Sequence, residues 1–120
     1  MNLKDCLRKL ESEGRLCHVK TEVDPVHELS GIAARLEGGK VVQFDRVKGS
    51  EFPVVTGLWW IRDYRACVFG CETERLSFLF SDAVAALHSN PVAPVVVENA
   101  PAQSIVMDTP DLTRIPVPTH

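Results

Sequence analysis

The sequence predicts an α/β fold: a small layered domain with a short mixed sheet and about four helices. Segments with apolar residues at helical spacing alternate along the chain with short runs of β-branched and aromatic residues. The 120 residues are 45% hydrophobic and 24% charged, which is typical of a globular protein with one core. We therefore expect helices packed against a sheet.

The first half of the chain predicts two helices and two strands. Asp24 and Pro25 indicate the start of the second helix, because Asp caps a helix and Pro needs no hydrogen-bond partner in the first turn. Gly14 is expected to end the first helix, whose apolar face consists of Leu3, Cys6, Leu7 and Leu10. The expected strands are residues 16–19 and 41–44.

A third strand is predicted from Phe52 to Trp60. Side chains alternate between the two faces of a strand, so Trp59 and Trp60 are expected on opposite faces. One tryptophan can then fill the core of this domain. The other needs a second layer, either a helix or a neighbouring domain.

Two further helices are expected after this strand. The first covers residues 62–69 and ends at Gly70; the second is capped by Thr73 and closed by Asn90 and Pro91. Its predicted buried stripe consists of Leu76, Leu79, Phe80, Ala83 and Leu87. Residues 95–97 are predicted to form a strand and residues 105–107 a short extended piece.

The last ten residues indicate a continuation of structure. Pro116 and Pro118 hold the backbone extended within an Asp-Leu-x-x-Ile-Pro-x-Pro run. We expect residues 1–107 to form an N-terminal α/β domain, and residues 108–120 to be a linker and the start of a second domain. The chain is then expected to be the front part of a longer protein.

Composition disfavours several classes of function. The formal net charge is −3, and no basic patch favours nucleic acid. Residues 54–61, the longest apolar stretch, are too few to span a bilayer, and residues 1–6 carry charges where a signal peptide needs an apolar run. We expect a cytoplasmic protein with no membrane span.

Candidate catalytic groups are scattered. His18, His27, His88 and His120 are far apart in the sequence, and Gly38-Gly39 lacks the context of a phosphate-binding loop. Arg62 and Arg65 can grip a phosphate, although an Asp63/Arg65 ion-pair face is favoured; Glu98, Asp108 and Asp111 form a loose acidic cluster. We assign no catalytic, cofactor-binding or metal-binding residue within this chain.

The four cysteines are interpreted as free thiols. Cys67 and Cys71 lie at helical spacing and could bind a metal with Cys17 and His18, but a small buried hydrophobic role is favoured for such residues. A structural disulfide is not expected in the cytoplasm.

A series of short motifs in order resembles the N-terminal region of the UbiD family of decarboxylases, which depend on prenylated FMN. Within this series, the Glu-Leu-Ser-Gly and Asn-Pro-Val-Ala-Pro-Val segments most resemble those of family members that act on hydroxybenzoate-type acids. The motifs are Val23-Asp24-Pro25, Glu28-Leu29-Ser30-Gly31-Ile32, Phe44-Asp45-Arg46-Val47-Lys48-Gly49, Phe52-Pro53-Val54, Asn90-Pro91-Val92-Ala93-Pro94, Asn99-Ala100-Pro101-Ala102-Gln103, Asp111-Leu112 and Ile115-Pro116-Val117-Pro118-Thr119-His120.

The resemblance implies a cytoplasmic, oligomeric carboxy-lyase in which a split β-barrel follows this domain. It also implies prenylated FMN from a partner flavin prenyltransferase, with Mn²⁺ and K⁺ at the cofactor phosphate, and a small aromatic acid substrate. The arginine and two glutamates that move protons in the family lie after the Pro-x-Pro-x-His segment. None of them is carried onto this sequence.

Three functional interpretations follow. In the first, this is the N-terminal domain of a UbiD-like carboxy-lyase, and Trp59, Trp60, Pro116, Pro118 and His120 lie at its interface with the next domain. The alternative is a stand-alone interaction or assembly module that lacks catalysis. A small Cys/His metal protein is the third.

Overall fold

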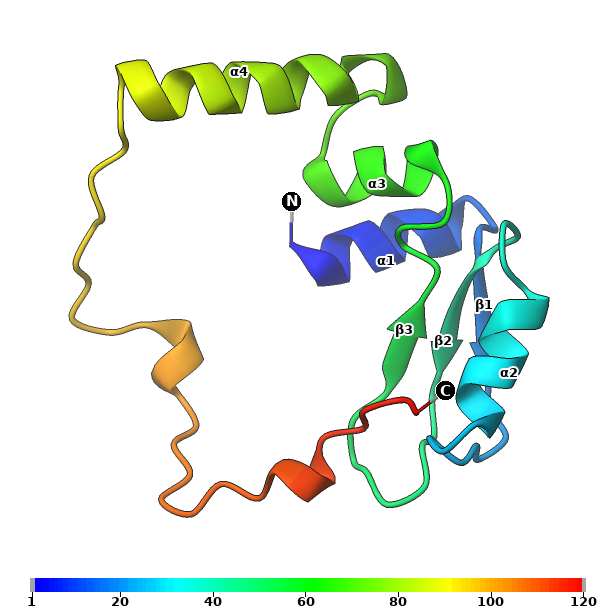
Figure 1. Cartoon of the computed structure of the whole chain (residues 1–120). Helices are drawn as coiled ribbons and strands as arrows, with labels where there is room; N and C mark the ends of the chain where they lie inside the picture. Colours follow the sequence, from blue (N-terminus) through cyan, green and yellow to red (C-terminus); the bar gives the residue numbers. More distant parts are fainter. Residues whose placement is uncertain (1, 120) are drawn as a thin grey trace.

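A three-stranded mixed sheet forms the middle layer of the computed structural model, which describes residues 2–119 (Figure 1). Strand β1 (Leu16–Val19) pairs in parallel with β2 (Val41–Phe44), and β2 pairs antiparallel with β3 (Val54–Thr56). The central strand is therefore β2. The predicted α/β class and mixed sheet are confirmed.

Helices cover both faces of this sheet. Helices α1 (Leu3–Ser12) and α3 (Arg62–Phe69) lie on one face, and α2 (Glu28–Arg35) lies on the other (Figure 1). The longest helix, α4 (Leu76–Ser89), follows a 3₁₀ turn, η1 (Thr73–Arg75), and extends beyond the sheet.

Two apolar clusters form the core, one on each face of the sheet. Val41 points toward α1 and α3, where it packs with Leu10 and Tyr64. Val42 and Phe44 point toward α2 and pack with Leu29. The alternation of side chains along β2 thus explains why Val41, Val42 and Phe44 are all buried: both faces of the strand are covered.

Local capping signals explain the helices that were predicted correctly. The Asn2 side chain accepts a hydrogen bond from the Asp5 amide at 2.9 Å, which caps α1. The positive φ of Gly14 lets the chain turn after α1, as expected. Gly70 ends α3 in the left-handed conformation that glycine adopts without strain.

The predicted start of the second helix at Pro25 is wrong. Asp24 caps a local turn, because its carboxylate accepts from the Val26 amide at 2.9 Å, and α2 begins only at Glu28. The residues between are held outside the helix by other partners: the His27 amide donates to the Thr119 carbonyl at 2.9 Å. His27 therefore precedes the helix and does not lie in its first turn.

The predicted strand from Phe52 to Trp60 is also too long. Strand β3 ends at Thr56, and a turn follows in which the Trp60 amide donates to the Gly57 carbonyl at 3.1 Å. Trp59 and Trp60 do lie on different sides of the sheet, with Trp59 against Phe69 of α3 and Trp60 in the cluster under α2. The turn after Gly57, and not strand alternation, separates them.

Helix α4 is not buried as predicted. Leu76 is buried, but the rest of the predicted stripe is exposed, and Leu87 is 67% exposed. Thr73 does not cap the helix either; its hydroxyl donates to the Asp63 carboxylate at 3.0 Å.

Residues 90–118 lie mostly exposed along an extended path that leaves α4 and returns to the sheet (Figure 1). The strand predicted at residues 95–97 is absent, and Val96 is 94% exposed. Residues 105–107, expected as a short extended piece, belong to no helix or strand. Two 3₁₀ turns, η2 (Pro101–Gln103) and η3 (Leu112–Arg114), interrupt the segment.

The dimensions reflect this open arrangement. The radius of gyration is 17.5 Å, whereas a compact chain of this length has about 14 Å. Among residues 2–119, no helix is long and apolar enough to cross a membrane.

We predict that Phe44→Ala lowers the free energy of unfolding by about 3–5 kcal/mol, because Phe44 is fully buried and its removal leaves a cavity. Urea unfolding measures the change. The control is Phe78→Ala on the exposed surface of α4, which should cost less than about 1 kcal/mol. Equal losses for both variants would contradict the position of the core.

Candidate functional site

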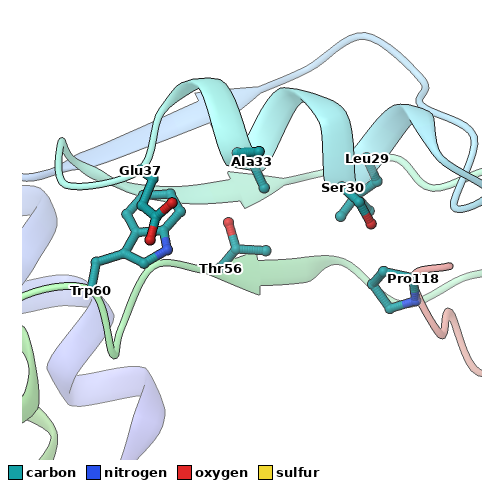
Figure 2. Close-up of a pocket in the computed structure, with 8 residues that line it drawn as sticks. Leu29, Ser30, Ala33, Glu37, Thr56, Trp60 and Pro118 are labelled. Atoms are coloured by element: carbon teal, nitrogen blue, oxygen red, sulfur yellow. The ribbon is translucent and has the colours of Figure 1, made fainter. Parts of the chain in front are cut away.

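A groove between α2, β3 and the end of the described chain is the candidate binding site. Its volume is about 360 Å³, and Figure 2 shows its walls. The lining residues are Leu29, Ser30, Ala33, Ala34, Glu37, Thr56, Trp60 and Pro118.

The wall from α2 arises from helical spacing. Ser30, Ala33 and Glu37 follow one another at intervals of three and four residues, so they share one face of the helix and its C-terminal extension. The small side chain of Ala33 leaves room in the middle of the groove. Glu37 provides a carboxylate at one end.

Backbone hydrogen bonds hold the last described residues against the start of α2. The Thr119 amide donates to the Pro25 carbonyl at 3.0 Å, and the Ser30 hydroxyl donates to the Thr119 carbonyl at 3.2 Å. Val26 and Thr119 also form an isolated parallel bridge. These bonds place Pro118 in the wall of the groove, far from Trp60 (Figure 2).

Gly57 determines where the Trp60 ring lies. A Cβ atom at Gly57 would be 2.6 Å from the ring, and the φ of Gly57 is +93°. A side chain cannot occupy this position unless the ring moves. The neighbouring Thr56 hydroxyl is buried without a hydrogen-bond partner in the structure, and it points toward α2 (Figure 2).

An ion pair anchors the loop that leads into α2. Asp24 accepts hydrogen bonds from the Val26 amide and from the Lys48 ammonium, the latter at 2.9 Å. These two bonds lower the pKa of Asp24 below its ordinary value. The loop is therefore tied to the turn between β2 and β3.

His18 lies in a carboxylate pair on the surface. Its Nδ1 atom is 3.0 Å from Asp45, and its Nε2 atom is 3.5 Å from Glu11. Partial burial opposes ionisation of Asp45, but hydrogen bonds from His18 and Gln43 lower its pKa overall. His18 thus faces acidic side chains and not the cysteines considered with it.

The other candidate clusters are not assembled. Among residues 2–119, no three His, Cys, Asp or Glu side chains are placed to hold a metal ion. The Asp111 carboxylate instead accepts from the Thr113 amide at 3.0 Å, which starts η3. Asp63 pairs with Arg15 at 3.2 Å and not with Arg65, so the expected Asp63/Arg65 pair is wrong. Arg62 donates to the Thr73 carbonyl and to the Ser77 hydroxyl.

The predicted interface residues separate into two regions. Trp60 and Pro118 line the groove, and Pro116 lines an adjacent apolar hollow that also contains Phe52 and Ile115. Trp59 lies elsewhere and is 60% exposed. His120 lies outside the described residues.

An aromatic row accompanies Trp59. Its ring centroid is 6.0 Å from that of Phe69, which is 4.9 Å from that of Phe80 in an edge-to-face arrangement. This aromatic row was not expected from the sequence. The spacing that placed Phe80 on the apolar stripe of α4 was the available signal.

The main groove does not fit a flavin. No basic side chain lines the main groove, and its charged group, the Glu37 carboxylate, would repel the phosphate of FMN. The groove is suited to an apolar group. We derive no chemical step within this chain.

The helices packed on both faces of the sheet define an α/β domain. Its candidate binding surfaces are the apolar groove and the exposed aromatic row. The family profile of the 3-octaprenyl-4-hydroxybenzoate carboxy-lyase N-terminal domain, UbiD_N, matches residues 7–84. The chain therefore belongs to the UbiD family, as its N-terminal domain.

Two sequence relatives illustrate the similarity. An uncharacterized protein in the cooM 5′ region of Rhodospirillum rubrum is 39% identical over 113 residues, which are 93% of this chain and 24% of that protein. The anhydromevalonate phosphate decarboxylase of Methanosarcina mazei is 28% identical over 100% of this chain and 26% of its own length. The chain spans about a quarter of the length of these relatives.

Solved structures share the fold. The UbiD-class enzyme HmfF from Pelotomaculum thermopropionicum, in complex with FMN, matches with a TM-score of 0.76 and 34% identity. The match covers 98% of this chain and 26% of HmfF. An evolved dimeric form of HmfF, in complex with prFMN, has the same TM-score and covers 99% of this chain and 28% of its own.

We predict that Gly57→Ala displaces the Trp60 ring and lowers the free energy of unfolding by about 1–3 kcal/mol, because the new Cβ meets the ring in a strained backbone. Tryptophan fluorescence and urea unfolding measure the two effects. The matched control is Gly31→Ala in α2, where a Cβ meets nothing within 4 Å; it should be neutral or stabilising by up to about 1 kcal/mol. An unchanged spectrum for Gly57→Ala would contradict the described position of Trp60.

Proposed function

We propose that this chain serves as the N-terminal domain of a carboxy-lyase that decarboxylates or carboxylates an aromatic or α,β-unsaturated acid with prenylated FMN. The observation that carries the proposal is the likeness to UbiD-class HmfF over 98% of this chain. The Methanosarcina mazei relative is a decarboxylase, which supports the same reaction class.

The chemistry is proposed to reside outside this chain. The described residues bring together no metal-ligand cluster, and the main groove carries a carboxylate where a flavin phosphate would need cations. Prenylated FMN, Mn²⁺ and K⁺ would then be held by another part of the protein, which works in the cytoplasm and receives its cofactor from a flavin prenyltransferase. When bound, the flavin would supply the electron sink for the reaction.

The role of this domain is proposed to be docking. Residues 1–107 form the α/β domain, and residues 108–120 lead into the cofactor-binding domain. The exposed apolar surface of α4 and the Trp59–Phe69–Phe80 row supports this, because monomeric proteins rarely leave large apolar patches uncovered. We propose the cofactor-binding domain of the same protein as the group that covers them, with Pro116, Pro118 and His120 at the same junction as Trp60.

Homo-oligomer formation is part of the proposal. The evolved dimeric form of HmfF indicates that at least one similar enzyme exists as an assembly. The alternative function is a separate assembly subunit without catalysis, which would use the same apolar surface to bind its partner chain. The genomic reading frame after the His120 codon distinguishes the two: a long frame supports the carboxy-lyase, and an immediate stop codon supports the subunit.

We predict that the 120-residue chain, purified after co-expression with a flavin prenyltransferase, has no flavin absorbance and releases no CO₂ from hydroxybenzoate-type acids. The protein from the longer reading frame should show both, because the flavin site lies in the added sequence. Stoichiometric flavin on the 120-residue chain would contradict the proposal.

We predict that Val84→Ser together with Leu87→Ser changes the free energy of unfolding of the 120-residue chain by less than about 1 kcal/mol, since both side chains are exposed there and neither belongs to the aromatic row. In the longer protein the same pair should lower the melting temperature by about 5 °C or more, because the apolar surface is then buried. The control is Asp82→Ser on the same helix, which should leave both proteins unchanged. An unchanged melting temperature of the longer protein would refute docking through α4.

A further inference from the structure

Two buried cysteines lie in contact between α1 and α3. The Sγ atoms of Cys6 and Cys67 are 3.0 Å apart, although 61 positions separate the two residues in the sequence. Cys6 is fully buried and Cys67 is 7% exposed. Neither thiol contributes to the groove or to the proposed docking surface.

The packing around Cys6 and Cys67 keeps their sulfur atoms in contact. Both cysteines belong to the apolar cluster with Leu10, Val41 and Tyr64, so α1 and α3 keep the sulfur atoms aligned. A disulfide requires about 2.05 Å between its sulfur atoms, so that bond formation needs a shift of roughly 1 Å. Packed helices can make a shift of this size without separating.

The two thiols differ in access. Cys67 and Cys71 line a polar hollow of about 200 Å³. Its other charged lining residues are Lys9, Arg15, Glu13, Asp63 and Glu72. Cys6 does not line this hollow. Burial, followed by the hydrogen bond with Cys67, raises the pKa of Cys6 to about 12, so Cys6 remains protonated at neutral pH.

We propose that Cys6 and Cys67 form a site of reversible oxidative modification, in which a small-molecule disulfide converts the thiol pair into a covalent link between α1 and α3. The oxidant enters through the polar hollow, where Cys67 is the member of the buried pair that it meets first. The inference is independent of the proposed carboxy-lyase activity.

The thiol–disulfide exchange takes place in two steps. The Cys67 thiolate attacks one sulfur of the oxidant, which breaks the oxidant's disulfide and releases one thiol. Cys6 then attacks the Cys67 sulfur, and its proton passes to the departing thiolate, which leaves as the second thiol. The protein loses two hydrogens and two electrons, and one disulfide oxidant becomes two thiols.

The disulfide would join the N-terminal helix α1 covalently to α3. Oxidation closes a loop that contains β1, α2, β2 and β3, and the closed loop restricts the unfolded chain. We expect the melting temperature to rise by about 10 °C.

The test uses the 120-residue chain with Cys17→Ser and Cys71→Ser, which removes the two cysteines that lie outside the buried pair. It is incubated with oxidised glutathione under native conditions. The thiols titrated after denaturation should fall from two to none, and the intact mass should fall by about 2 Da as two hydrogens are lost. Dithiothreitol should restore both thiols and the original melting temperature.

The control adds Cys6→Ala to the same background. It should retain glutathione on Cys67, because the resolving thiol is absent. If the parent variant also accumulates a stable glutathione adduct, or keeps two free thiols, the proposal is overturned. Circular dichroism of each variant before oxidation shows whether the fold is retained. A second measurement needs no substitution: peptide mass spectrometry of the oxidised wild-type chain should identify a Cys6–Cys67 link.

Discussion

The burial of β2 on both of its faces is the constraint on which the structure depends. Val41 needs α1 and α3 above it, whereas Val42 and Phe44 need α2 below it. Because burial of these side chains stabilises the fold by the hydrophobic effect, the chain must place helices on both sides of one strand. The two clusters then fix the turn after Gly57, the position of Trp60 and the floor of the groove.

The burial of β2 on both faces also explains why α4 and residues 90–118 are left exposed. Helix α4 and residues 90–118 are rich in apolar side chains, but the sheet has no free face left to cover them. Their exposure is consistent with a domain whose own core is complete and whose outer apolar surface belongs to an interface. The UbiD family membership and the proposed docking role agree with this division. The main groove, with its Glu37 carboxylate, does not fit a flavin phosphate.

Much of the fold could be predicted where the signal is local. The cap at Asn2 lies beside its helix, and Gly70 ends α3 through its own backbone conformation. The start of α2 was missed because an Asp-Pro pair begins a turn as readily as a helix, and contacts with Thr119, ninety-odd positions later, decide between them. The strand expected at residues 95–97 needs a partner strand, which propensity alone does not supply. Trp60 and Pro118 were anticipated at a junction, whereas Glu37 required the packing of the whole groove.

Amide hydrogen exchange on the 120-residue chain and on the longer protein tests whether the core is complete without α4 and whether α4 is an interface. The amides of β2 should be protected in both, because the core is complete within this domain. The amides of α4 should exchange rapidly in the short chain and become protected in the longer protein, where the cofactor-binding domain covers the helix. Equal protection of α4 in the two proteins would contradict the account.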